Sequence, residues 1–458
     1  MKKSIIKISG IAMLLLSTSC SKESCSYVTE CVPNEPEGFM VNTMNMDNIS
    51  NTAAIYKTTF TSNAPIGSDW NDLSLGTNKV VEVIPTRWNK SDIGQVFGIA
   101  IDDNNGIYLS ASKLYNIDYP VVPFTSSSFG TAGSAGIYKT DVVSLSTIDF
   151  VTTENFLNTN TVGRAKIPNA DTGLGNIAFD KKNNQLFATN LEDGRIYRID
   201  GTTGIVKSIY DPFVQELTPS AGMVAAGEQL WGIGILEKNN KTYVFFARTL
   251  TESIPSFLNS FNGITGTKSI YSIELDSSGE FLANEIGSTK LFVDSSSQPK
   301  LEIANVPGTQ AKITDIAFSC SGRMLLAERG APHDSKVLEY INSGSSWIVG
   351  SMFYTGDYLT GDNSAGGVDY GDRENLGSFV KDDVVWATAN AMNYANNTGV
   401  LLYGVQGMSS SGNSPITSAN TLTDLFIDYD HVYNNSGTIK GGHGDVEIFD
   451  SSCPCNKR

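Results

Sequence analysis

Histidine is scarce in this chain, and so are the short motifs that mark known reactions. Only three histidines occur in 458 residues, and no GxSxG nucleophile elbow, HExxH metal motif or glycine-rich phosphate loop is present. One of them, His443, stands in the segment Gly441-Gly442-His443-Gly444-Asp445, where it could act as a base or a ligand. The alternative is a single exposed loop histidine. The sequence alone therefore names no reaction.

Basic residues are also few, with 32 Lys and Arg against 48 Asp and Glu, for a formal net charge of −16. Such an excess of acid disfavours nucleic acid as a partner and gives no reason to expect adhesion to anionic lipid. It favours either simple solubility or attraction for cations and cationic partners.

Long apolar runs are missing except at the N-terminus, where the stretch from Ile11 to Leu16 follows Lys2, Lys3 and Lys7. This run is too short to span a bilayer, and it predicts an export signal over residues 1–19. Its removal takes away three Lys and no acid, which brings the net charge to −19. No other stretch is long and apolar enough to be transmembrane.

The end of the signal, Leu16-Ser17-Thr18-Ser19-Cys20, resembles a bacterial lipobox, with the leucine one place earlier than usual. The resemblance implies that Cys20 carries lipid and that residues 20–36 form an anchor and tether. It also implies attachment to the outer membrane of a Gram-negative envelope, on its periplasmic or outer face. The alternative is ordinary secretion with Cys20 free or disulfide-bonded.

A repeated pattern fills the rest of the chain: a buried strand, a polar turn and a second apolar strand. Copies begin at Phe97, Gly175, Trp231, Thr314 and Gly366. Repetition at this spacing indicates an array of units that bury a shared core. Each unit has room for four strands, so the sequence predicts an all-β propeller over residues 37–455.

The unit that begins at Gly175 is the clearest, with strands expected at 176–180, 185–189, 195–200 and 204–210. It resembles an NHL-type repeat, a family of propeller blades whose usual form is GIAVD, then IYVAD, then RIxxFD. The resemblance implies a propeller fold and leaves the activity open. Outermost strands are expected at 142–148 in the first copy and at 291–293 in the third.

The two ends of the chain supply a sixth blade. Strands are expected at 38–43, 53–60 and 79–84 without an innermost strand before them, and at 445–449 with nothing after it. Pairing the C-terminal strand with the N-terminal blade would close a six-bladed ring and leave no open edge.

Four cysteines lie beside the strands that would close the ring: Cys25 and Cys31 before the first, Cys453 and Cys455 after the last. Closure would bring both pairs together in an oxidising compartment, and we expect one or two bridges between them. A bridge that closes so long a loop stabilises by about 5 kcal/mol on the chain-entropy model. The alternatives are local pairing within each pair, and a metal site.

The first residues of the innermost strands alternate between glycine and Asn or Asp. In chain order they are Gly98, Asn176, Gly232, Asp315, Gly367 and Asp445. Asn176, Asp315 and Asp445 would converge on the axis, where their oxygens could hold Ca²⁺ or another divalent cation. Gluconolactonase-like propellers are similar in placing Glu, Asn and Asp around a central ion, although no diagnostic motif of that family is present. The alternative is that these residues cap turns.

Further polar and aromatic residues are expected on the same face. Asn190, Glu328 and Asn390 stand near the ends of second strands. Long connections at 112–135 and 249–266 carry aromatic residues that include Tyr115, Tyr119 and Phe257. Exposed aromatic loops favour binding of a protein or glycan, and the alternative is that they pack onto the barrel mouth.

The sequence therefore favours a lipid-anchored propeller that acts as a binding or scaffold module through one face, with an envelope protein or a glycan as its partner. The competing reading is a metal-dependent hydrolase of the lactonase type, with Glu328 or His443 as the base. A third reading is a glycan-binding accessory protein that uses the aromatic loops.

Overall fold

The computed structural model describes the residues that build the repeated strands and most of their short turns. They are residues 38–46, 50–58, 81–104, 106–113, 115, 129–155, 161–213, 229–251, 266–282, 299–307, 311–330, 334–356, 361–375, 378–393, 401–413, 425–428 and 441–449. The elements named in these ranges are all β-strands. No helix among these residues is long and apolar enough to cross a membrane. Cys20, the four terminal cysteines, Tyr119 and Phe257 lie outside them.

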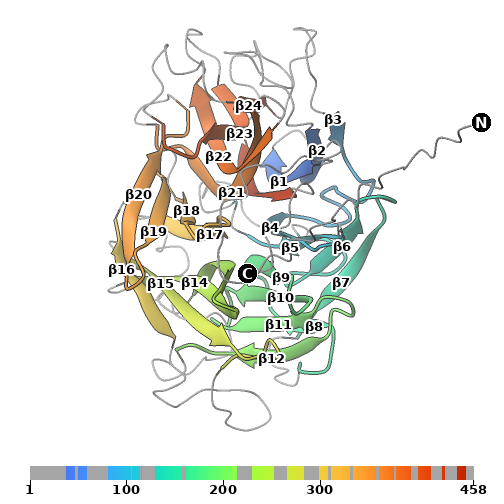
Figure 1. Cartoon of the computed structure of the whole chain (residues 1–458). Coiled ribbons are helices and arrows are strands. Elements are labelled where there is room, and N and C mark those ends of the chain that lie inside the picture. Colours follow the sequence, from blue (N-terminus) through green and yellow to red (C-terminus); the bar gives the residue numbers. More distant parts are fainter. Residues whose placement is uncertain are drawn as a thin grey trace, which may run out of the picture.

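Six small sheets form a closed ring, the six-bladed β-propeller that the repeats predict (Figure 1). The first blade contains Val96–Ile101 (β4), Gly106–Ala111 (β5), Ile137–Asp141 (β6), Thr147–Glu154 (β7) and Lys166–Pro168 (β8). The second contains Leu174–Asp180 (β9), Gln185–Asn190 (β10), Ile196–Asp200 (β11) and Val206–Tyr210 (β12). The third contains Leu230–Lys238 (β13), Lys241–Thr251 (β14), Gly266–Leu275 (β15) and Lys300–Val306 (β16).

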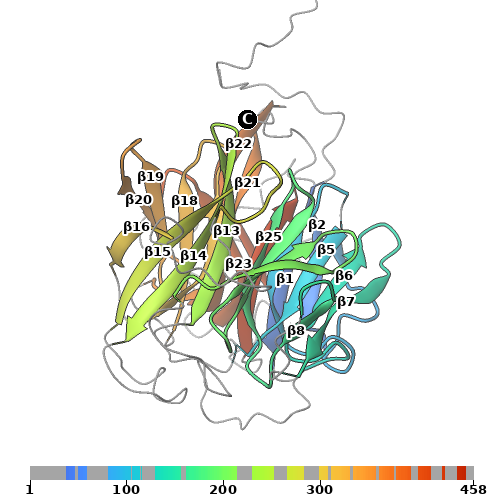
Figure 2. The same cartoon turned by 90° about the horizontal axis from the view of Figure 1, so that it is seen from below.

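The next two blades and the closing blade complete the ring. The fourth blade contains Lys312–Phe318 (β17), Met324–Arg329 (β18), Val337–Asn342 (β19) and Trp347–Phe353 (β20). The fifth contains Ser364–Asn375 (β21), Ser378–Asn393 (β22), Leu401–Ser409 (β23) and Leu425–Asp428 (β24). The closing blade contains Gly441–Phe449 (β25), Gly38–Met46 (β1), Ala53–Thr58 (β2) and Val81–Val83 (β3). Figure 2 shows the blades from the side, standing next to one another around the axis.

The innermost strands are β4, β9, β13, β17, β21 and β25, and each contacts the next around the ring. Because neighbours cover both faces of these strands, most residues of β9 and β17 are buried, and so are all six residues of the apolar β4. The outermost strands differ, since β16 is exposed at four of its seven positions.

The ring closes as the sequence predicts: β25 pairs antiparallel with β1, and the red end of the chain lies beside the blue one (Figure 1). Phe39 faces Phe449 in this pairing, and their rings stack with centroids 5.0 Å apart. A bulge near Asn42 shifts the register before His443. Closure pairs the innermost strand that would otherwise have a free edge.

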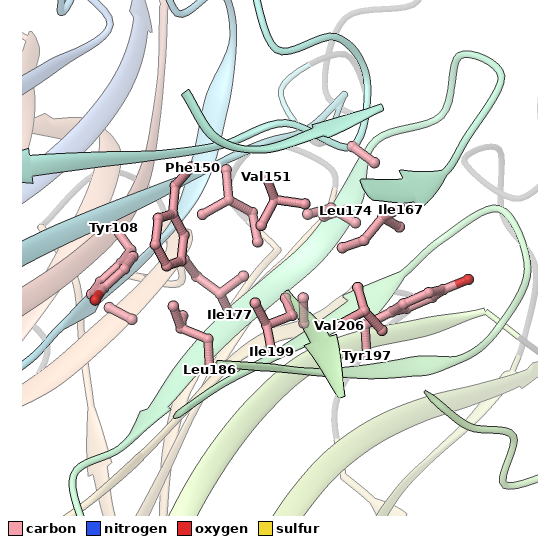
Figure 3. Packing of buried hydrophobic residues seen from close by; sticks show 14 of the residues in the cluster. Tyr108, Phe150, Val151, Ile167, Leu174, Ile177, Leu186, Tyr197, Ile199 and Val206 are labelled. Carbon is pink, nitrogen blue, oxygen red and sulfur yellow. The ribbon is translucent and has the colours of Figure 1, made fainter. Parts of the chain in front are cut away.

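The hydrophobic core lies between adjacent blades rather than in one central mass. Between the first and second blades, Tyr108 and Phe150 pack with Ile177 and Leu186 (Figure 3). The Tyr108 and Phe150 rings meet edge to face at 5.3 Å. Such layers make each blade depend on its neighbours for burial.

Two outer strands differ from the sequence expectations. Residues 142–146 form a turn, and the fourth strand of the first blade is β7, which pairs in parallel with the short β8. The fourth strand of the third blade is β16, and not residues 291–293, which lie outside the described ranges. Outermost strands carry little of the buried core, so their apolar pattern is weak.

Candidate functional site

The three axial residues that the sequence singles out do meet. Asn176 on β9 donates a hydrogen bond from Nδ2 to Asp315 Oδ1 on β17 at 3.1 Å, and another to the Thr314 carbonyl at 2.9 Å. Asp315 is in turn hydrogen-bonded to Asp445 on β25. Asn176 and Asp445 are fully buried, and Asp315 is 3% exposed.

The alternation with glycine has a steric cause. A Cβ at Gly232 would lie 2.7 Å from the Asp315 nitrogen, and one at Gly367 would lie 2.5 Å from the Asp445 Cα. A Cβ at Gly98 would collide with Asn176 Oδ1 in the same way. Each Asn or Asp therefore occupies the space that a glycine leaves on the neighbouring innermost strand, and the six strands close tightly around the axis.

The axial carboxyl oxygens are already engaged. Asp445 Oδ2 accepts from Ile99 N at 2.9 Å, and Asp315 Oδ2 accepts from Val368 N at 2.8 Å. Both bonds join neighbouring blades, so these residues link blades and do not cap turns. A divalent cation at Asn176, Asp315 and Asp445 would have to compete with these N–H donors. Among the described residues no three His, Cys, Asp or Glu side chains form a metal-binding group.

The pair Asp315 and Asp445 shares a proton. Burial raises the pKa of Asp315 to about 6. Burial and the Asp315 carboxyl raise the pKa of Asp445 well above its usual range. Two carboxyls in hydrogen-bond contact cannot both be ionised in a buried site, so near neutral pH one of them is the donor.

A second carboxyl pair lies two residues beyond Gly367 and Asp445, at Asp369 of β21 and Glu447 of β25. They are hydrogen-bonded to each other, and the Ile448 and Tyr370 nitrogens also donate to Asp369. Burial raises the pKa of Asp369 to about 7 and that of Glu447 well above its usual range. Sequence reasoning missed this pair, although the repeated spacing in GGVDY and GDVEI contains it.

His443 is not an exposed loop residue. It belongs to β25, it is fully buried, and its Nδ1 lies 2.8 Å from Asn42 Oδ1 on β1. Burial lowers its pKa to about 3, so the ring is neutral and Nδ1 donates to the amide oxygen. This geometry gives His443 a role in joining the two strands that close the ring.

The other three predicted polar residues also have protein partners. Asn190 is fully buried and donates to the Pro168 carbonyl at 2.9 Å. Glu328 is fully buried, forms an ion pair with Lys268 and accepts from Lys336 N at 2.9 Å. Asn390 accepts from His443 N at 3.1 Å. All three hold neighbouring segments together.

An aromatic cluster lies at the end of the ring where the innermost strands begin. Phe97, Tyr115, Leu191 and Trp231 form this buried group, which we call the mouth cluster. Tyr115 packs onto the ring and its hydroxyl donates to the Val96 carbonyl at 2.8 Å, as the packing alternative for the loop aromatics predicts. The mouth cluster thus covers the axial pair from one end.

Two cations lie against the mouth cluster, and sequence reasoning missed both. The Arg329 guanidinium lies 5.2 Å from the Tyr115 ring centre and donates to the His443 and Ala365 carbonyls. Lys312 Nζ lies 5.7 Å from the Trp231 ring centre. The only sequence clue is position, since Phe97 and Trp231 each directly precede an axial glycine.

No protein-family model and no curated protein sequence matches the chain. Among solved structures, a chain of a nidogen/laminin complex is similar with a TM-score of 0.39 and 9% identity, over 90% of this chain and 98% of that one. A selenium-binding protein from Sulfolobus tokodaii, described as hypothetical, gives 0.41 and 12%, over 91% and 80%. A protein from Bacteroides uniformis ATCC 8492, described as "a putative 6-phosphogluconolactonase", gives 0.39 and 10%, over 89% and 82%. Likeness at this level carries no statement about shared chemistry.

Proposed function

We propose that the protein is an exported, lipid-anchored propeller that binds an envelope partner or ligand at the mouth end of the ring. Cys20 would carry the lipid, and residues 20–36 would form the tether. The observation that carries the binding role is a contrast between two sets of side chains. The groups that a hydrolase would use, His443, Glu328 and the axial carboxyls, are engaged in holding strands together. The mouth cluster, by contrast, consists of the apolar and aromatic side chains of Phe97, Tyr115, Leu191 and Trp231.

A cross-linking experiment on the full chain in intact cells tests whether the partner binds at the mouth end of the ring. A photoreactive amino acid is placed at Asp171, an exposed residue before β9 at the mouth end, or at Lys181, an exposed residue after β9 at the opposite end. We expect a defined adduct from position 171 and none from position 181. No adduct at either position, or equal adducts at both, would contradict binding at the mouth.

Lipid attachment is tested separately. Metabolic labelling with a radioactive fatty acid should label the full chain and leave Cys20→Ala unlabelled, and only the first should fractionate with membranes. Equal membrane fractions for both chains would remove the anchor from the proposal.

Hydrolysis at a metal on the axis is the competing function. It requires about one tightly bound divalent ion per chain after purification without chelator, lost in Asp315→Ala. Absence of such an ion would leave the axial residues as links between blades.

A further inference from the structure

Lys312 is a buried cation without an acceptor. It is the first residue of β17, its side chain is 3% exposed, and its backbone pairs with that of Arg329. Within the described residues its ammonium makes no hydrogen bond and no ion pair, and lies instead against the Trp231 ring. Lysine is rarely this buried unless it is paired.

The charge that acts on Lys312 does not compensate it. It is another ammonium, that of Lys268, which is itself paired with Glu328. Burial and Lys268 lower the pKa of Lys312 to about 8, so the group still carries charge at neutral pH. The Lys268–Glu328 pair is neutral as a unit, which leaves one uncompensated positive charge beside it.

A second donor in the same place also has no acceptor. Trp231 is 2% exposed, and its indole Nε1–H is buried without a hydrogen-bond partner in the described part of the chain. An indole N–H can only donate, and so can an ammonium. Because Lys312 Nζ lies against the Trp231 ring, one small acceptor group can reach both donors.

We infer that Lys312 and Trp231 bind the carboxylate of a small ligand whose apolar body packs on the mouth cluster. Lys312 and Trp231 offer two donors, one ammonium and one neutral N–H, which match the two oxygens of a carboxylate, whereas the nearby Arg329 guanidinium donates to the His443 and Ala365 carbonyls. Phe97, Tyr115 and Trp231 form the buried apolar group beside these donors, so the rest of the ligand would have to insert among their rings. This inference rests on the proposed binding role of the mouth.

The test uses the full-length protein in detergent and titrates phenylacetate, acetate and inorganic phosphate by calorimetry at pH 7. We expect phenylacetate to bind more tightly than acetate, and phosphate to bind least. Lys312→Met should weaken phenylacetate binding at least tenfold, Trp231→Phe about threefold, and Lys312→Arg much less than Lys312→Met. Lys181→Met, which removes an exposed lysine on the opposite end, should bind as the wild type does.

Chemical labelling gives a second readout. Phenylacetate should slow acetylation of Lys312 by acetic anhydride, measured by mass spectrometry, without slowing that of Lys181. Lys312→Met should unfold at the same temperature as the wild type or higher, because it removes an unpaired buried charge.

Equal phenylacetate affinity of wild type and Lys312→Met, phosphate binding more tightly than phenylacetate, or no binding of any probe would overturn the carboxylate site. Cross-linking at position 171 would then still decide whether the mouth binds another partner. Failure of the carboxylate site can therefore be told apart from failure of the proposed binding role.

Discussion

Replacing Glu447 by glutamine tests whether the axis holds protons. Glu447 and Asp369 are hydrogen-bonded to each other, which requires a proton between the two carboxyls. Burial and then the Asp369 and Asp445 carboxyls raise the pKa of Glu447 well above its usual value. Glutamine has nearly the shape of a protonated glutamate, and its amide can donate the same hydrogen bond at every pH.

The pH dependence has a definite sign. A carboxyl whose pKa is raised in the folded state keeps a proton that the unfolded chain releases, so its stabilising contribution is present at low pH and is lost as the pH rises toward the folded value. For one proton the loss is about 1.4 kcal/mol for each pH unit between an unfolded pKa of about 4.5 and the raised folded value. Glu447→Gln should therefore match the wild type near pH 5 and exceed its unfolding free energy at pH 8.

Urea unfolding followed by tryptophan fluorescence at pH 5, 6, 7 and 8 measures this difference. The control is Asp103→Asn, because the Asp103 side chain is 58% exposed, and its curve should run parallel to that of the wild type. Neutral, buried His443 opposes acid stability below about pH 6.5, but it does so equally in all three proteins. Parallel curves for wild type and Glu447→Gln would refute a shared proton at Asp369 and Glu447.

Two further substitutions test other parts of the ring. Gly367→Ala should lower the unfolding free energy by about 3 kcal/mol, because its Cβ would lie 2.5 Å from the Asp445 Cα. Gly322→Ala, where the new Cβ has free space but φ is +79°, should lower it by about 1 kcal/mol. Equal losses for the two variants in urea unfolding would contradict tight axial packing. Lys268→Met should lower the unfolding free energy by about 3–5 kcal/mol, because it leaves Glu328 buried and unpaired, and adding Glu328→Gln should recover much of that loss. A double variant no more stable in urea than Lys268→Met would argue against the ion pair.

The innermost strands and the closure were predictable because both depend on strong local patterns. A strand covered on both faces buries nearly all of its residues, so the apolar β4 and the apolar second half of β17, residues 316–318, stand out from the sequence. Closure follows from counting, since three strands at one end lacked the fourth that residues 445–449 supply.

The outermost strands were less predictable for the opposite reason. In β16 the residues run from exposed Lys300 to buried Val306 without strict alternation, and only two of seven positions are buried. A strand that contributes so little to the core can start at several places with a similar apolar pattern. Its position depends on pairing with β15, which the sequence does not display.

The axial residues could also be predicted from the sequence, whereas the cations at the mouth could not. The alternation of glycine with Asn or Asp is periodic, and it correctly brings Asn176, Asp315 and Asp445 together. Lys312 and Trp231 are single residues in different blades, and nothing in their local sequence marks them as neighbours. Their importance comes from missing acceptors, a property that exists only after the chain has folded.

The order of charges along the axis favours binding at the mouth over chemistry deeper in the ring. A ligand at the mouth would meet Lys312 and Arg329 first, then the shared-proton pair Asp315 and Asp445 beneath them. An anionic group is attracted by the cations and repelled by the negative charge that the carboxyl pair retains. Glycine-against-Asx packing also brings neighbouring innermost strands into close contact at that level. A carboxylate ligand should therefore stop at Lys312, with the acidic pair as the floor of its site.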